Sequence, residues 1–325
     1  MHTIVARNVN TALADGLRYL NVMGQKQESR NGEVLVSPCP VITMYAIPEH
    51  RVLFSPIRDA NPFFHLMEAL WMLAGRSDVA WPAFFNKRFP EYSDDGLTLN
   101  GAYGRRWRVD FGYDQLFAIV TMLKADPNSR RAVLQMWSPE DLTRESKDLP
   151  CNTVIYFRVR EGMLDMTVSN RSNDIYWGAY GANAVHMSIL QEFMAAAIGV
   201  KMGFYYQISN NYHCYTDLPE LNSEAARTFM ADRSEKADFY TTGQVTSSPL
   251  VSSEATQWMS DLNDFMKDPL NIPMFADPFF KNTAVPMFTS WYKRKQKIGN
   301  GLAEAKQIVA PDWRLASVEW IERRM

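Results

Sequence analysis

The sequence feature that most constrains the fold is an apolar helical segment at 182–199, ANAVHMSILQEFMAAAIG, with strand-like sequence on both sides. Apolar residues cover most of the circumference of this helix, and a helix of that kind is buried on most sides. Before it, 152–160 and 163–171 are rich in strand-forming residues, and the intervening Glu-Gly pair at 161–162 is typical of a hairpin turn. The strand pattern resumes at 202–209. The sequence therefore predicts a sheet that packs against one central helix.

Further helices and strands are expected on either side of this unit. The spacing of apolar residues predicts helices at 8–23, 61–75 and 113–127, and β-rich stretches at 34–54 and 130–138. From Tyr215 onward the chain is mainly helical and ends in a basic helix that contains tryptophan. We expect an α+β fold, a mixed β-sheet packed with helices.

Composition narrows the class of protein. The 325 residues are 46% hydrophobic and 22% charged, and no linker-like stretch divides them, so we expect a single domain over 1–325. A formal net charge of -2 offers no basic surface for nucleic acid, and no apolar run is long enough to span a membrane. The three cysteines have no CxxC spacing, which argues against disulfides and against a metal site. We expect a cytoplasmic protein.

Cys151 is the first candidate for chemistry, because it follows a proline at the start of a strand, in LPCNT. Clusters that contain arginine lie before it at 129–131 and after it at 170–174. Arginine suits phosphate binding and favours the thiolate form of a nearby cysteine. Each arginine alone is better explained as a solvated charge, but the combination favours an anionic substrate beside a nucleophile. Cys39 and Cys214 are expected to be structural.

Two further groups carry polar side chains of interest. His213 and Tyr215 in NNYHCY alternate along a strand and therefore share a face, which suits a sugar hydroxyl; an internally satisfied buried pair is the alternative. Glu68 lies on an apolar helix three residues before Trp71. Burial of a carboxyl group favours a raised pKa and a role in proton transfer, whereas a buried salt bridge is the alternative.

Six segments in order resemble the superfamily of thymidylate synthases and pyrimidine nucleotide (dCMP/dUMP) hydroxymethylases. They are MEALWMLAG, NGAYGRRWR, DPNSRRAVLQMWSP, LPCN, NRSNDIYWG and NNYHCY, and the resemblance covers about Arg30 to Tyr215. It implies a thymidylate synthase-like sheet whose face forms a dimer interface, followed by a divergent helical region from about 253 to 325. It also implies 5,10-methylenetetrahydrofolate as co-substrate.

The resemblance implies a role for Cys151 as the thiolate that adds to C6 of a pyrimidine nucleoside monophosphate and activates C5. Hydride transfer from the folate then gives a methyl group, whereas water gives a hydroxymethyl group. By the same resemblance the phosphate is held by Arg30, Arg171 and Ser172, together with Arg130 and Arg131 from the partner subunit of a homodimer. The sugar is bound by His213 and Tyr215, the base by Asn183 and Asn152, and the folate by Asp174 and Trp71. Glu68, Tyr103 and Asp174 are implied to assist catalysis.

Three departures from the family pattern bear on substrate and product. Asn152 stands where the synthases usually carry histidine, and an asparagine amide pairs with either uracil or cytosine. The spacing from Arg171 to Asn183 is one residue longer than usual, so the loop WGAYGA must be rebuilt. The C-terminal tail that closes over the folate in synthases has no counterpart after Pro286.

A site without that lid admits water. We therefore expect a deoxypyrimidine monophosphate 5-hydroxymethyltransferase, with dCMP favoured over dUMP, of the kind used by phages. A thymidylate synthase with an unusual lid and an inactive nucleotide-binding homologue are the alternatives. If a phage encodes the chain, the expected compartment is the host cytoplasm.

Overall fold

A computed structural model of the chain describes residues 1–218, 238–271 and 274–325. Its strands form one mixed sheet in the order β1-β4-β8-β7-β6-β5, and β3 joins β8 and pairs with β2. The pairs β1 with β4 and β7 with β8 are parallel, and the other pairs are antiparallel. The strands are β1 His2–Ala6, β2 Gln25–Ser29, β3 Gly32–Val36, β4 Val41–Tyr45, β5 Val133–Gln135, β6 Asn152–Arg160, β7 Met163–Asp174 and β8 Lys201–Tyr215. The α+β class predicted from the sequence is confirmed.

The β6–β7 hairpin forms where the sequence predicts it. Glu161 and Gly162 both have positive φ, 51° and 74°. Two consecutive residues with positive φ are the requirement of a type I′ turn, whose twist matches that of the paired strands. The hairpin fixes the register from Arg160 opposite Met163 to Val154 opposite Ser169, and a shift between Val154 and Asn152 then brings Asn152 opposite Asn170.

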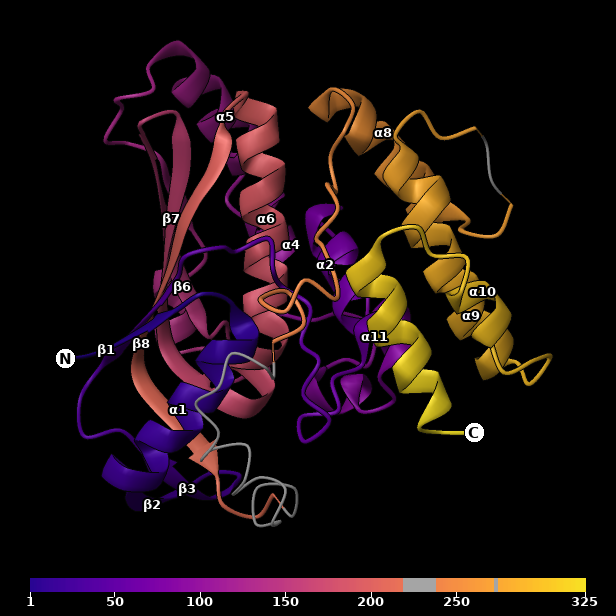
Figure 1. The fold of residues 1–325 in the computed structure, drawn as a ribbon. Coiled ribbons are helices and arrows are strands. Elements are labelled where there is room, and N and C mark those ends of the chain that lie inside the picture. The colour runs from indigo at the N-terminus through magenta and orange to yellow at the C-terminus, as the bar shows by residue number, and fades with distance from the viewer. Residues whose placement is uncertain (219–237, 272–273) are drawn as a thin grey trace.

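Helix α6, Asn183–Ile198, is the predicted central helix. Nearly all of its side chains are buried, and it lies along the sheet while α2 packs on its other side (Figure 1). The remaining helices before β8 are α1 Val9–Met23, α2 Pro62–Leu73, α3 Ala80–Phe85, α4 Tyr103–Arg108 and α5 Gln115–Ala125. Helix α2 begins after Asn61, whose side chain accepts a hydrogen bond from the Phe64 N–H. The α2–α6 packing is what brings polar residues of the two helices together.

The helices after β8 lie on the side of α2 and α6 that faces away from the sheet (Figure 1). The α-helices there that the structure describes are α8 Ala255–Lys267, α9 Val285–Lys295, α10 Leu302–Ala305 and α11 Pro311–Glu322. Helix α11 contacts α2 through Trp320, whose ring lies edge-on to Phe63 at 5.8 Å between centroids. Of the chain after Tyr215 that the sequence predicts to be mainly helical, 219–237 and 272–273 lie outside the described residues.

The strand predictions need correction. Strands β1 and β2 lie in segments that the sequence pattern did not mark, because five residues at a sheet edge give too short a pattern. The β-rich stretch 34–54 contains only part of β3 and β4, and 46–54 is not a strand. The segment 130–138 supplies only the three residues of β5. No helix in the described ranges has the length and apolar character needed to cross a lipid bilayer.

Candidate active site

Cys151 lies directly before β6 and is tied to Arg171 of β7. The main-chain N–H of Arg171 donates to the Cys151 carbonyl at 2.9 Å, and its guanidinium donates from Nε to the Pro150 carbonyl at 2.9 Å. Nη2 of Arg171 also donates to the Leu149 carbonyl at 3.0 Å and lies 4.0 Å from the Cys151 Sγ. One arginine of the predicted substrate site is therefore in direct contact with the predicted nucleophile.

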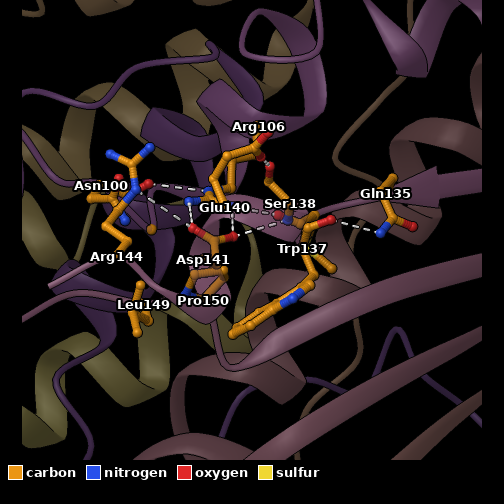
Figure 2. A network of polar contacts seen from close by, with 12 residues as sticks. Asn100, Arg106, Gln135, Trp137, Ser138, Glu140, Asp141, Arg144, Leu149 and Pro150 are labelled. Atoms are coloured by element: carbon orange, nitrogen blue, oxygen red, sulfur yellow. Dashed lines mark hydrogen bonds and ion pairs between the residues drawn. The ribbon is translucent and has the colours of Figure 1, made fainter. Parts of the chain in front are cut away.

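The loop that precedes Cys151 is held by a buried ion pair. Arg106 of α4 contacts Asp141 through both carboxylate oxygens, from Nη1 at 2.5 Å and from Nη2 at 2.9 Å (Figure 2). It also donates from Nη1 to the Met136 carbonyl at 2.7 Å and from Nε to the Asn100 carbonyl at 3.1 Å. Because the two side chains are 6% and 1% exposed, the pair has little competition from water. Arg106 thus connects α4, the end of β5 and the loop before Cys151.

Burial dominates the protonation of the Cys151 thiol. Desolvation raises its pKa, and the nearby Asp148 carboxylate adds to that effect. The positive charges of Arg171 and Arg30 lower the pKa, as expected from the sequence, but they are outweighed. The expectation that the arginines favour the thiolate is correct in direction, whereas the net pKa shift is upward because burial penalises the charged form.

Tyr103 and Asn152 lie beside Cys151. The Asn152 N–H donates to the Tyr103 hydroxyl at 3.3 Å, and burial holds the pKa of that phenol well above its ordinary value. The Asn152 side chain is fully buried, and neither amide atom has a hydrogen-bond partner among the described residues. An unpartnered buried amide is costly, so this position suits a polar ligand edge.

Glu68 and Asp148 are two carboxyl groups in the same region. Burial raises the pKa of Glu68 to about 8, and the charge of Asp148 contributes. Asp148 accepts a hydrogen bond from the Gly101 N–H at 2.7 Å, and burial raises its pKa as well. The predicted raised pKa of Glu68 is therefore confirmed, and it has the predicted cause.

Asn183 is oriented by a short chain of hydrogen bonds. Its Nδ2 donates to Oδ1 of Asn173 at 3.1 Å, and Nδ2 of Asn173 donates to Oγ of Ser209 at 3.0 Å. The residue extra to the usual spacing lies in the rebuilt loop, which forms a π-helical segment, Ile175–Ala182. A π-helix holds more residues per turn than an α-helix, a geometry that accommodates one extra residue.

Asp174 and His213 are paired across β7 and β8. Oδ1 of Asp174 accepts from the Trp177 N–H at 2.6 Å, whereas the buried Oδ2 has no partner among the described residues, and burial raises the pKa of this carboxyl group. The Arg58 guanidinium lies over the half-exposed Trp177 ring, 4.6 Å from its centroid. Buried Nδ1 of His213 also lacks a partner in the described chain. This end of the sheet thus offers a half-exposed aromatic ring and two buried polar atoms that have no hydrogen-bond partner in the described chain.

The strand that carries His213 ends beside the β2–β3 hairpin. Tyr215 lies opposite Val34 of β3, and its hydroxyl accepts a hydrogen bond from Asn31 Nδ2 at 3.4 Å. The rings of His213 and Tyr215 are 5.7 Å apart, so they share one face as predicted. Arg30 precedes Asn31 in the same turn, and its charge acts on Cys151. The β2–β3 hairpin, which carries Arg30 in its turn, therefore lies against the end of β8.

The remaining predicted residues are less closely gathered. Arg130 and Arg131 are exposed before β5, and neither guanidinium has a partner among the described residues. Ser172 is half-buried opposite Asn211. Trp71 is only 2% exposed in the core, and its Nε1 donates to Asp78 at 3.2 Å. The roles of these four residues stay predictions.

Sequence reasoning missed two titratable residues. Asp148, three residues before Cys151, influences the pKa of Glu68, Tyr103 and Cys151. His186 of α6 has its Nε2 3.2 Å from Oε2 of Glu68. The charge of Asp148 so close to a predicted nucleophile is a local signal that could have marked it. The contact of His186 depends on the packing of two helices and has no local signal.

Comparisons with known proteins bear on the family. The family model described as thymidylate synthase matches residues 14–237. A protein of Pseudomonas phage M6 named deoxyuridylate hydroxymethyltransferase is 47% identical over 100% of this chain and 95% of its own length. Proteins with the same name from Bacillus phage SP01 and Delftia phage PhiW-14 are 42% and 29% identical; the matches cover 55% and 68% of this chain, and 50% and 64% of those proteins.

Proposed function

Because the chain belongs to the thymidylate synthase family, we propose that it is an enzyme that hydroxymethylates C5 of a deoxypyrimidine 5′-monophosphate. The observation that carries the proposal is the contact between a single thiol and a guanidinium, 4.0 Å from Cys151 Sγ to Arg171 Nη2, in a chain similar over its full length to a protein named deoxyuridylate hydroxymethyltransferase. The predicted membership of this superfamily is confirmed.

In this proposal Cys151 adds to C6 of the pyrimidine and so makes C5 nucleophilic. Tyr103 supports this step, because its hydroxyl is hydrogen-bonded beside the thiol, and its high pKa keeps it a proton donor. Glu68 is protonated at neutral pH because burial raises its pKa to about 8, so it serves as the acid that organises water and proton transfer. When Cys151 leaves, the ring regains its double bond between C5 and C6.

Arg171, Arg30 and Ser172 are proposed to bind the 5′-phosphate. The support is electrostatic: the charges of Arg171 and Arg30 both act on Cys151, so the phosphate and the reacting ring are held at one site. His213 and Tyr215, which share one face at the end of β8, are proposed to bind the sugar hydroxyl. The open Nδ1 of His213 supports a hydrogen bond to the ligand.

Asn183 and Asn152 are proposed to contact the base. Nδ2 of Asn183 donates one of its two hydrogens to Asn173. The other N–H and Oδ1 remain for the pyrimidine ring. These two groups can serve uracil, by donating to O4 and accepting from N3–H, or cytosine, by donating to N3 and accepting from the 4-amino group. The preference for dCMP predicted from the departures near the base is not confirmed. We give dUMP precedence, because the related phage proteins are named for deoxyuridylate.

The co-substrate, 5,10-methylenetetrahydrofolate, supplies the one-carbon unit when it is bound. The residues around Asp174 fit a flat ring with hydrogen-bonding edges, since Oδ2 of Asp174 has no partner within the described chain and the Trp177 ring is 48% exposed. Asp174 would therefore hold the pterin, and Trp177 would contact its face. Trp71 donates its indole N–H to Asp78. We therefore propose that it supports the folate site from the core and does not contact the folate directly.

We also propose a homodimer in which the face of the sheet that α6 does not cover meets its copy. Across this face Val133 lies opposite Tyr156, Tyr156 opposite Thr167, and Thr167 opposite Tyr206. Val133 and Tyr156 are 39% and 48% exposed, whereas the adjacent row that contains Leu134 and Ile155 is fully buried. Exposed apolar side chains on a broad sheet face mark a contact surface. Arg130 and Arg131 are free to reach the partner's phosphate site.

Two further expectations remain proposals. A single domain over 1–325 is supported by one buried apolar cluster that includes Ile4 and Ile321. A cytoplasmic location, in the host if a phage encodes the chain, is supported by three cysteines that are all free. Neither bears on the chemistry at Cys151.

The proposal is tested by incubating the protein with 5,10-methylenetetrahydrofolate and one nucleotide at a time, dUMP, dCMP or CMP, and measuring the mass of each product. We expect dUMP to gain CH2O. A gain of CH2O on dCMP at a higher rate would restore the preference based on the departures near the base. A gain of CH2 would instead indicate methylation, and no change with any nucleotide would contradict catalysis of this reaction.

A further inference from the structure

A buried histidine faces the carboxyl group of Glu68. His186 lies one turn after Asn183 on α6, and α6 packs against α2, which carries Glu68. Nε2 of His186 is 3.2 Å from Oε2 of Glu68, and the side chains are 3% and 12% exposed. Neither atom has a hydrogen-bond partner among the described residues, so the two lie within reach of each other without a formed hydrogen bond. The two groups are therefore available only to each other or to a ligand.

The protonation states of Glu68 and His186 decide which of them can donate a hydrogen bond and which can accept one. Burial raises the pKa of Glu68 to about 8 and lowers the pKa of His186 to about 3, so both are neutral at neutral pH. A hydrogen bond with the His65 main chain opposes the shift in His186. Since Nε2 makes no such bond, Nδ1 makes it and carries the ring proton. Nε2 is then able to accept a hydrogen bond, and the protonated carboxyl group within reach of it is able to donate one.

The other titratable groups near this pair are Asp148, His65 and Arg58. Asp148, in the loop before β6, raises the pKa of Glu68 by its negative charge. On α2 itself, burial lowers the pKa of His65, and the charge of Arg58 adds to that effect, so this ring is also neutral. The His65 ring lies edge-on to that of His186, with 6.2 Å between centroids. Nε2 of His186, 3.2 Å away, is therefore the candidate acceptor for a proton on Oε2 of Glu68.

We propose that His186 is a positioning residue for the hydroxymethylation reaction: its Nε2 accepts a hydrogen bond from the protonated Glu68 carboxyl group and so holds Oε1 of Glu68 toward the pyrimidine and the attacking water. This inference rests on the proposed function. A fixed Oε1 provides a hydrogen-bond acceptor for water at one place, and a protonated carboxyl group avoids a second negative charge beside the nucleotide. His186 itself touches neither substrate nor water.

The experiment compares two variants that lack an acceptor, His186→Phe and His186→Leu, with His186→Gln, whose amide oxygen still accepts. The first readout is the infrared C=O band of protonated Glu68 as a function of pH in the protein without ligands, assigned by its loss in Glu68→Gln. We expect loss of the acceptor to lower the titration midpoint by about one pH unit, and glutamine to retain most of it.

The second readout is kcat as a function of pH, with KM for the nucleotide measured alongside. We expect the alkaline limb of kcat in His186→Phe to move down by about the same one pH unit, with KM little changed. His65→Phe is the matched control, because it alters a buried ring next to His186 but not the acceptor. Its carboxyl titration should stay at the wild-type midpoint.

The two readouts separate the inference from the proposed function. If the wild-type protein makes no hydroxymethyl product, the proposed function fails, and the infrared titration still tests the contact. If the midpoint is the same in wild type, His186→Phe and His186→Leu, or if His65→Phe moves it equally, the assignment of His186 is overturned. If phenylalanine prevents folding, the comparison of leucine with glutamine decides.

Discussion

The main-chain N–H of Arg171 donates a 2.9 Å hydrogen bond to the main-chain carbonyl of Cys151. The candidate nucleophile and a candidate phosphate ligand are therefore joined by a main-chain hydrogen bond, and the distance between their backbones does not depend on side-chain rotamers. The guanidinium of Arg171 adds two bonds to the same loop, at Pro150 and Leu149. A site of this kind is organised before any ligand arrives, which lowers the entropy cost of bringing the reacting groups together.

Replacement of the nucleophile separates binding from chemistry. We expect Cys151→Ala to reduce turnover by more than about 10³-fold, because no other group can form the covalent bond to C6. Nucleotide binding, measured by calorimetry, should persist because the arginines remain. Cys39→Ala is the control, since Cys39 is a half-buried thiol that contacts Tyr19, and it should keep turnover. Comparable turnover in Cys151→Ala would remove the basis of the proposed mechanism.

The buried ion pair between Arg106 and Asp141, which holds the loop before Cys151, should contribute strongly to the free energy of unfolding. Arg106→Ala leaves the buried Asp141 carboxylate without its partner, and we expect a loss of about 3–5 kcal/mol in the free energy of unfolding by urea. Arg105→Ala next to it removes only an exposed pair with Asp110 and should cost less than about 1 kcal/mol. Equal losses in the two variants would show that the network in Figure 2 does not hold the loop.

A shared site predicts complementation between two inactive variants. In a mixture of Cys151→Ala and Arg131→Ala subunits, each mixed dimer has one site with both lesions and one site with neither. Random exchange at equal amounts should therefore restore about one quarter of the wild-type activity, measured after refolding the mixture. Recovery should be absent when either variant is refolded alone. A mixture that stays inactive would contradict the contribution of Arg131 across an interface.

Glu68 should make the protein less stable as pH rises. Its pKa rises on folding from 4.5 to about 8, so the folded state binds the proton more tightly than the unfolded state. The free energy of unfolding then falls as pH increases through that window and levels off above it. Glu68→Gln removes this dependence, so we expect higher stability than wild type at pH of about 8 together with loss of activity. Parallel stability curves for the two proteins would refute the raised pKa.

Much of the fold follows from local patterns in the sequence. The periodicity of α2, α5 and α6 marks these helices because each buries a continuous apolar surface. The hairpin at Glu161 and Gly162 follows from turn chemistry alone. Strand β1 escapes prediction because it is short and lies at the sheet edge, where pairing with β4 supplies most of the order.

The candidate site likewise contains residues that sequence motifs predict and contacts that only the packing of the fold creates. Cys151, Arg171 and His213 lie in sequence motifs, and β6, β7 and β8 bring them to one end of the sheet. The contact of His186 with Glu68 depends on how α6 packs on α2, which no local pattern specifies. The net rise in the pKa of Cys151 likewise depends on burial, which offsets the arginines that the sequence brings to notice.

The origin of the oxygen atom in the product distinguishes hydroxymethylation by water from methylation. The reaction is run with dUMP and 5,10-methylenetetrahydrofolate in water enriched in ¹⁸O, and the nucleotide product is analysed by mass spectrometry. The account predicts a 5-hydroxymethyl nucleotide that carries ¹⁸O, with no dihydrofolate absorbance during turnover. A 5-methyl product without solvent oxygen, formed as that absorbance rises, would contradict it.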